Sequence, residues 1–155
     1  RIGIIASSDH GQTHQARAGV YVVDLPKLPA DLSHPAGFTR GGIIEALKAR
    51  RAFGATTAVT MQISVGDHPL GQELVVEEFP IINTYIAAPE PIKSVEVIRD
   101  NQFVFTTRPD KGEVRFQFQD ADLKPGQSAY YYIRAKIGEE DVAWSSPLWI
   151  ERKAP

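Results

Sequence analysis

The sequence predicts an α+β fold in which the strand–helix end of a (β/α) barrel, residues 1–57, precedes an antiparallel β-sandwich, residues 58–155. One observation is that strand and helix signals are mixed before residue 57. Another is that hydrophobic residues recur with a period of two after residue 58, with turn signals between the runs. We therefore expect two structural units that follow each other along the chain.

The N-terminal unit opens with the apolar run Ile2–Ala6, which ends at the polar residues Ser7-Ser8-Asp9-His10-Gly11. A continuous apolar run is typical of a strand that is buried on both faces, so we expect a strand with these polar residues at its C-terminal tip. Such a strand needs neighbours on both edges to satisfy its backbone. The chain is therefore expected to be the C-terminal part of a longer protein, with the missing N-terminal barrel as its partner.

A second β-type run, residues 19–23, and a helix over residues 40–52 complete the N-terminal unit. Thr39 precedes the helix and is a residue type that caps helix N-termini. Gly54 stands where a C-terminal cap is expected. The apolar residues that fall at helical spacing are Ile43, Ile44 and Leu47.

Short strands are predicted throughout the C-terminal unit. Apolar and polar residues alternate over residues 59–65, 114–118 and 131–137, which is typical of strands with one buried face. Turn signals separate the runs, among them Ala88-Pro89-Glu90-Pro91. The clearest hairpin pairs residues 95–99 with residues 102–106 around Asp100-Asn101, and no helical segment interrupts the unit.

Composition limits the partners and the kind of site. The net charge of −2 and the pI of about 6.1 give no basic surface for nucleic acid or for an anionic membrane. No stretch approaches the roughly 20 apolar residues of a transmembrane helix. The chain has no cysteine, so any metal site must use His, Asp or Glu.

Metal-ligating residue types gather after the first apolar run. Asp9 offers carboxylate oxygens, and His10 and His14 offer imidazole nitrogens, a set that suits Zn, Mn or Fe. Thr13 and His14 are candidates for a substrate contact or a further ligand. The local sequence leaves a second interpretation open, in which Asp9 and His10 are ordinary loop residues and Asp9 caps a turn.

The aromatic residues of the C-terminal unit suggest a different kind of site. Tyr130, Tyr132 and Trp149 would form a stacking surface for a glycan if they lay together on one exposed sheet face. Strand alternation directs Tyr131 inward and its two neighbours outward, which also fits ordinary packing on the sheet. A binding or structural module without catalysis is therefore the alternative to an enzyme.

Several segments resemble the end of the polymerase and histidinol phosphatase (PHP) superfamily domain, and more narrowly a bacterial subgroup of large, mostly uncharacterised metallohydrolases with a β-rich tail. The resemblance covers almost the whole chain. The segments that carry it are Ile4–Gly11, Thr13-His14, Val20–Val22, Ala46–Thr56, Val95–Asn101 and Ala143–Trp149.

The resemblance implies a distorted (β/α) barrel with two or three divalent metal ions, and hydrolysis of a phosphoester, ester or carbamate in a small-molecule substrate that the sequence does not identify. The last ligand motif of that superfamily maps onto Asp9 and His10. Its usual form is Asp-x-His, whereas Gly11 stands two residues after Asp9, so His14 is an alternative for the histidine role. Most ligands would lie elsewhere in the parent protein, so this chain alone is expected to bind metal weakly and to be inactive.

Overall fold

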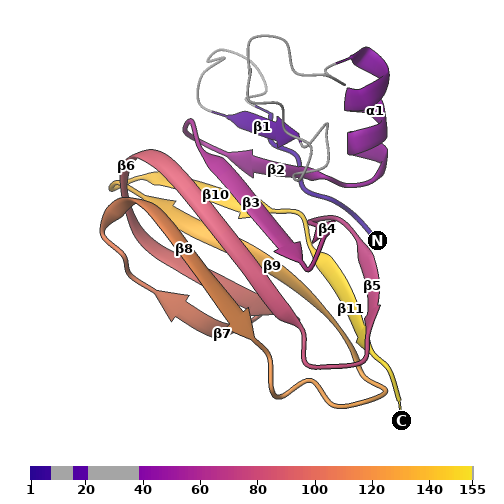
Figure 1. The fold of residues 1–155 in the computed structure, drawn as a ribbon. Coiled ribbons are helices and arrows are strands. Elements are labelled where there is room, and N and C mark those ends of the chain that lie inside the picture. Colours follow the sequence, from indigo (N-terminus) through magenta and orange to yellow (C-terminus); the bar gives the residue numbers. More distant parts are fainter. Residues whose placement is uncertain (8–15, 21–38, 155) are drawn as a thin grey trace.

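The computed structural model describes residues 1–7, 16–20 and 39–154, and within these residues the chain is nearly all β (Figure 1). The described strands belong to one connected sheet of eleven strands, with one described helix near its N-terminal end. In chain order the elements are β1 (Arg17–Val20), α1 (Arg40–Lys48), β2 (Ala52–Ala55), β3 (Thr60–Val65), β4 (His68–Pro69), β5 (Glu73–Val76), β6 (Ile81–Arg99), β7 (Gln102–Thr107), β8 (Lys111–Gln119), β9 (Ser128–Ile137), β10 (Asp141–Ser145) and β11 (Leu148–Arg152).

Strand β6 is 19 residues long and runs through the predicted turn at Ala88–Pro91, so that prediction is wrong. Proline lacks an N–H group, but its fixed φ is compatible with an extended chain. The two prolines fall where the pairing of β6 with β8 shifts register, between Ala87 and Ile92. The first part of β6 pairs with β3 and β8, and the second part pairs with β9 and β7. One strand therefore links two parts of the sheet.

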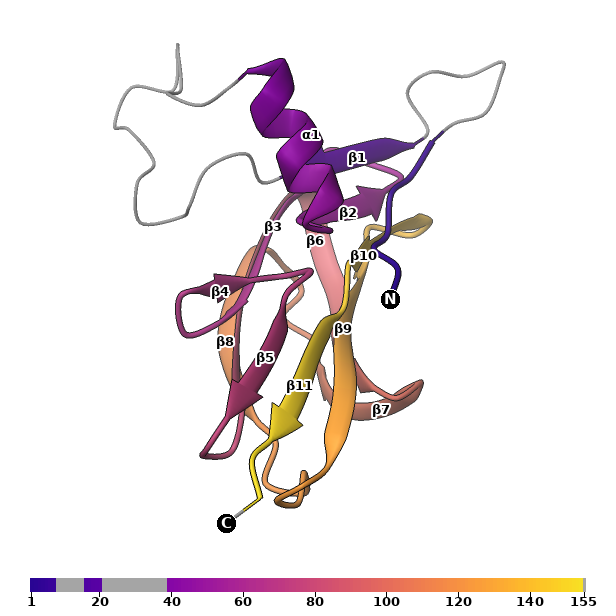
Figure 2. The same ribbon diagram turned by 90° about the vertical axis from the view of Figure 1, so that its right-hand side faces the viewer.

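Strand β9 organises the rest of the sheet by pairing with β6, β10 and β11. From β10 the sheet continues through β2 to β1, and from β11 it continues to β5 in the one parallel pair among the described strands. The sheet curls around one hydrophobic core (Figure 2). Large core side chains with almost no exposed surface include Met61, Ile63, Leu70, Ile82, Ile86, Ile92, Tyr131, Ile133, Ile137, Leu148 and Ile150.

The predicted α+β fold is wrong, because the described residues form one curled, mainly antiparallel sheet and no part of a (β/α) barrel. The apolar run Ile2–Ala6 forms no strand, and Ile2 and Ile5 are exposed. The backbone of Ile4 in this run is hydrogen-bonded to the side chain of Ser146 and not to a neighbouring strand. The apolar composition of this run predicted a buried strand, but the run pairs with no neighbouring strand. The predicted domain boundary after residue 57 stays a prediction, although β2 lies in the same sheet as β10.

Helix α1 begins where the sequence predicts and ends earlier. The Thr39 side chain accepts a hydrogen bond from the Gly42 amide at 3.0 Å, so the predicted N-cap is confirmed. The helix stops at Lys48, and Arg50 has a positive φ of 60°. Gly54 is not a cap, since it lies within β2, which is hydrogen-bonded on both edges. A Cβ at Gly54 would lie 2.8 Å from the Cβ of Ala6, so the missing side chain allows close approach of the N-terminal segment.

Several local predictions for the C-terminal unit are confirmed. The hairpin of β6 and β7 turns at Asp100 and Asn101, whose φ values of 48° and 65° fit a type I′ turn. Residues 131–137 lie in β9, where Tyr131 is buried and its neighbours Tyr130 and Tyr132 are half-buried. Alternation of side chains across a strand explains this pattern.

Thr84 of β6 carries a buried hydroxyl group. The residue is 2% exposed, and its Oγ1 has no hydrogen-bond partner among the described residues. We expect Thr84→Val to raise the free energy of unfolding by about 1 kcal/mol, because it removes a desolvated polar group at nearly constant shape. Urea denaturation tests this, with Thr60→Val on the exposed edge of β3 as the control. A destabilised Thr84→Val variant would show that the hydroxyl is hydrogen-bonded in solution.

Candidate functional site

The predicted metal ligands lie outside the described residues. Asp9, His10, Thr13 and His14 belong to the range 8–15, which the structure does not describe. Within the described ranges no group of three or more His, Asp or Glu residues is placed to hold a metal ion. The metal site therefore stays a prediction. The described residues closest to it in the sequence are residues 1–7, which precede the predicted ligands.

Residues 1–7 lie against the curled sheet and are attached there by Ser146. The backbone N–H of Ile4 donates to the Ser146 hydroxyl oxygen at 2.7 Å. The Ser146 hydroxyl in turn donates to the Ile4 carbonyl oxygen at 3.4 Å. Ser146 is 1% exposed, so water competes little for this contact. Gly3 lies so close to Arg50 and Ser146 that an added Cβ would meet their side-chain atoms at 2.9 and 3.0 Å. The sheet therefore holds the segment five residues before Asp9.

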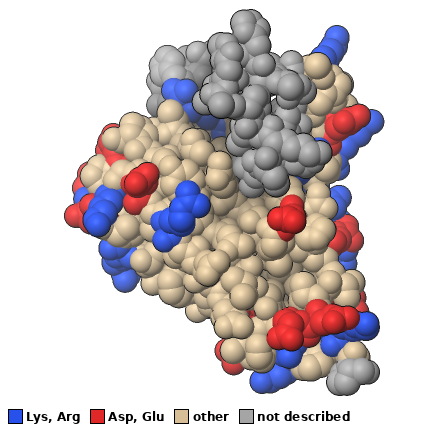
Figure 3. Space-filling view, in the orientation of Figure 1, with Lys and Arg blue, Asp and Glu red and all other residues tan. Residues whose placement is uncertain are grey.

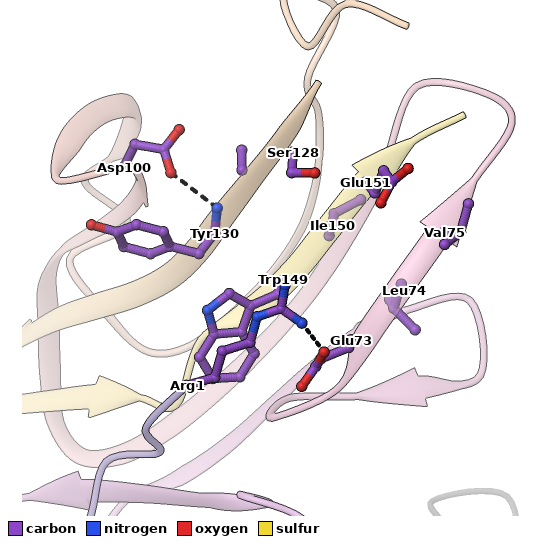
Figure 4. Close-up of a pocket in the computed structure, with 11 residues that line it drawn as sticks. Arg1, Glu73, Leu74, Val75, Asp100, Ser128, Tyr130, Trp149, Ile150 and Glu151 are labelled. Atoms are coloured by element: carbon purple, nitrogen blue, oxygen red, sulfur yellow. Dashed lines mark hydrogen bonds and ion pairs between the residues drawn. The ribbon is translucent and has the colours of Figure 1, made fainter. Parts of the chain in front are cut away.

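A second contact joins Arg1 and Arg50 to Glu73 of β5 and Trp149 of β11, and these four residues are called the tryptophan cluster. Figure 4 shows three of them, Arg1, Glu73 and Trp149. The Arg50 guanidinium lies 5.1 Å from the ring centroid of Trp149, within the range of a cation–π contact. Its Nη2 donates to Glu73 at 3.2 Å, and its Nε donates to the Gly71 carbonyl oxygen at 2.9 Å. Arg1 also forms an ion pair with Glu73 and lies 6.0 Å from the Trp149 ring.

The tryptophan cluster borders a hollow of about 280 Å³ that continues along β11 and β9 to Tyr130 and Asp100. Tyr130 is opposite Trp149 in the register of β9 and β11. Tyr130 and Tyr132 are stacked on each other, with centroids 6.5 Å apart and an angle of 9° between the rings. The three predicted aromatic residues therefore lie on one face of the sheet, as the interpretation of a stacking surface requires, but Arg1 and Arg50 lie over the ring of Trp149.

A buried carboxylate network lies at the same end of β9, on the face to which Tyr131 points. The Arg99 Nη1 donates to both carboxylate oxygens of Asp120, at 3.0 and 2.8 Å, and the Tyr131 hydroxyl donates to Asp120 Oδ2 at 2.6 Å. The backbone N–H of Asp122 donates to Asp120 Oδ1 at 2.9 Å. Burial alone would raise the pKa of Asp120, but the hydrogen bonds from Tyr131 and Arg99 hold that pKa below its usual value.

Burial, and then the hydrogen bond to Asp120, raises the pKa of Tyr131, so this phenol stays protonated and donates. Every acceptor position of Asp120 named above is occupied from within the protein, and Asp120 is only 3% exposed. This network is therefore suited to fixing the chain after β8 rather than to binding a substrate.

Sequence reasoning missed Ser146, Arg50, Glu73 and Asp120. Arg50 and Ser146 lie in segments that carry the resemblance given above, but no pattern indicated what either residue contacts, and Ser146 is 142 residues from its partner Ile4. A serine between a strand and a proline, as in Ser146-Pro147, offered no signal beyond a turn.

No protein-family model matches the chain, and no solved structure matches it. Three chlamydial proteins, all described as uncharacterised, are similar over 131 residues: the protein of Chlamydia pneumoniae is 28% identical, that of Chlamydia trachomatis 29% and that of Chlamydia muridarum 28%. Each match covers 74% of this chain and 21% of the relative, so the chain spans about a fifth of the length of these proteins. No helix of the described residues is long and apolar enough to cross a membrane.

Proposed function

We propose that this chain is the C-terminal part of a metal-dependent hydrolase of the PHP type, in which the described β-domain holds the segment that carries the predicted ligands Asp9 and His10. The observation that supports this role is the attachment of Ile4 to the buried Ser146 hydroxyl, five residues before Asp9. A ligand contributes to a multi-metal site only if its backbone is fixed within a fraction of an ångström. The hydrogen bond between Ile4 and Ser146 would contribute to that restraint, because it fixes the chain five residues before Asp9.

Divalent ions such as Zn, Mn or Fe would supply the chemistry when bound, by lowering the pKa of a water molecule and polarising the substrate oxygen. Asp9 would contribute carboxylate oxygens and His10 an imidazole nitrogen to their shells, with His14 and Thr13 near the substrate. The other ligands would come from the rest of the parent protein.

The partner in this proposal is another part of the same, longer protein. Apolar side chains of the N-terminal part are exposed: Ile2 by 85%, Ile5 by 62% and Ile44 of α1 by 44%. Two of these residues lie in the segment 1–7 and the third on α1, and exposed apolar side chains on both elements favour burial against a neighbouring structure. Relatives about five times longer than the matched region offer such a neighbour within one chain. In this proposal, Ile2, Ile5 and Ile44 form the surface that contacts the barrel of the parent protein.

The alternative function, a glycan- or protein-binding module built on Tyr130, Tyr132 and Trp149, is less well supported. A stacked sugar would need the face of the Trp149 ring, but Arg50 and Arg1 lie over this ring. The Trp149 side chain packs against the N-terminal part, and this favours a scaffold role for the cluster.

Metal binding tests the proposed function at two chain lengths. In isothermal titration calorimetry with Zn²⁺ or Mn²⁺, we expect the 155-residue chain to bind weakly, because most ligands of the proposed two- or three-metal site would lie elsewhere in the parent protein. In a protein of the relatives' length that contains this chain, we expect tight metal binding and hydrolysis of p-nitrophenyl phosphate. Asp9→Asn should lower that activity at least about 100-fold.

Asp67→Asn is the matched control, because Asp67 is an exposed aspartate that also precedes a histidine. Equal activity of the Asp9 variant and the control would refute the assignment of Asp9. Micromolar, stoichiometric binding by the 155-residue chain that disappears in Asp9→Ala would refute the claim that the remaining ligands lie elsewhere.

A further inference from the structure

Six polar side chains form two rows across the outer face of β3, β6 and β8. Cross-strand register places Gln62, Tyr85 and Arg115 in one row. It places Ser64, Asn83 and Gln117 in the next row along the strands. Neighbouring strands in a sheet lie about 4.8 Å apart, so each row presents three side chains within reach of one small ligand.

A hollow of about 500 Å³ lies over these two rows and is lined by all six side chains. Pockets that bind small molecules in proteins have volumes in the range of about 300–1,000 Å³. Gln62, Ser64, Asn83 and Tyr85 are half-buried although they face outward, because the side chains of the flanking strands enclose them. The space is therefore bounded by polar groups on three strands.

The polar groups in this hollow are partly arranged by one another. The Gln117 Nε2 donates to Asn83 Oδ1 at 2.7 Å, which leaves the Asn83 amide nitrogen and the Gln117 carbonyl oxygen for a ligand. The Arg115 guanidinium is 4.4 Å from the Tyr85 ring centroid, which orients its planar donors. The side chains of Gln62 and Ser64 make no hydrogen bond within the part of the chain that the structure describes.

This face carries little charge. Arg115 is the one charged residue among those that line the hollow, and Figure 3 shows a mostly tan surface over β3, β6 and β8, with few blue or red side chains. Binding of single-stranded nucleic acid requires a basic groove along the backbone, which six side chains with one positive charge do not supply. Paired donors and acceptors on amides and hydroxyls suit a neutral ligand with adjacent hydroxyl groups.

We propose that the face formed by Gln62, Ser64, Asn83, Tyr85, Arg115 and Gln117 is a binding site for a neutral oligosaccharide. Asn83 and Gln117 bind adjacent sugar hydroxyls with the free halves of their amides, and Gln62 and Ser64 bind the next sugar along the strands. Arg115 donates to a ring or hydroxyl oxygen while it stays stacked on Tyr85. This site is separate from the tryptophan cluster and does not depend on the hydrolase proposal.

Nuclear magnetic resonance titration of the ¹⁵N-labelled 155-residue chain tests the site, with maltohexaose and chitohexaose as the probes at millimolar concentration. We expect at least one probe to shift the amide signals of β3, β6 and β8 around these residues. The side-chain amide signals of Asn83 and Gln117 should shift with them. The double variant Asn83→Ala/Gln117→Ala should weaken this binding at least about tenfold.

Gln102→Ala is the matched control, since Gln102 is an exposed glutamine on β7 outside the hollow, and it should leave the affinity unchanged. No shift with either probe would overturn the proposal, and so would shifts that persist in a folded double variant. An equally strong shift with a single-stranded oligonucleotide would also overturn it, because a neutral polyol site does not bind a polyanion.

Discussion

Replacing Asp120 with Ala is expected to lower the free energy of unfolding by about 3 kcal/mol. Asp120 accepts hydrogen bonds from Arg99, from Tyr131 and from the Asp122 amide, and it is 3% exposed. Its removal leaves the Tyr131 hydroxyl buried without its acceptor and Arg99 without its counter-charge. Losing one partner of a buried, hydrogen-bonded ion pair costs far more than losing an exposed one.

The same change should alter how stability depends on pH. Burial raises the folded-state pKa of Asp120, but the hydrogen bonds from Tyr131 and Arg99 lower it by more, so this pKa lies below its usual value. The stabilisation is therefore fully present above the unfolded-state pKa of about 3.9 and is lost as the pH falls through the lower, folded-state pKa. The difference in stability between the unsubstituted chain and Asp120→Asn should shrink over that window.

Urea denaturation of Asp120→Ala, Asp120→Asn and Asp122→Asn at pH 7 and at decreasing pH checks both parts. Asp122 is exposed and contributes a backbone donor to the network, so Asp122→Asn should change stability by less than about 0.5 kcal/mol. Equal stability of the Asp120 and Asp122 variants at pH 7 would show that the network is not formed in solution.

Replacing Gly71 with Ala is expected to destabilise the protein by about 3 kcal/mol, for two reasons that add. Gly71 has a positive φ of 87°, which a side chain disfavours. An added Cβ would also lie 2.3 Å from the Arg50 carbonyl oxygen and 2.7 Å from that of Ala49, and backbone atoms cannot move aside singly. Gly71 therefore packs directly against the backbone of Ala49 and Arg50, which follow α1.

Gly66→Ala is a matched control, because Gly66 also has a positive φ, of 54°, and no atom within 4 Å of an added Cβ. It should cost about 1 kcal/mol, the conformational part alone. Thermal or urea denaturation of both variants separates the two contributions. If both variants lose the same stability, then the close approach between Gly71 and the end of α1 does not occur in solution.

Local features of this fold could be predicted from the sequence, and its overall architecture could not. The Asp100-Asn101 hairpin and the burial of Tyr131 follow from turn chemistry and side-chain alternation, which act between neighbouring residues. The course of β6 depends on a change of partner strands at Pro89 and Pro91, and those partners come from distant parts of the chain. A Pro-rich segment therefore looked like a turn.

The N-terminal segment shows the same limit at the candidate site. Ile2–Ala6 has the composition of a buried strand, yet its hydrogen bond goes to a serine near the other end of the chain. Ser146 and Arg50 lie in segments that carry the resemblance, but their contacts with this segment could not be predicted, because those contacts form only when the sheet closes. The chemistry of Asp9 and His10 was suggested by residue type and by resemblance, and it stays a prediction.

The most direct measurement of the scaffold role is hydrogen exchange at the Ile4 amide in the 155-residue chain. This N–H donates to the buried Ser146 hydroxyl, so we expect it to be protected although Ile2 and Ile5 on either side are exposed. Ser146→Ala should speed its exchange at least about tenfold, and Ser128→Ala, an exposed serine on β9, should not. An Ile4 amide that exchanges freely in the unsubstituted chain, or equally in all three proteins, would contradict the proposal that the sheet holds the segment leading to Asp9 and His10.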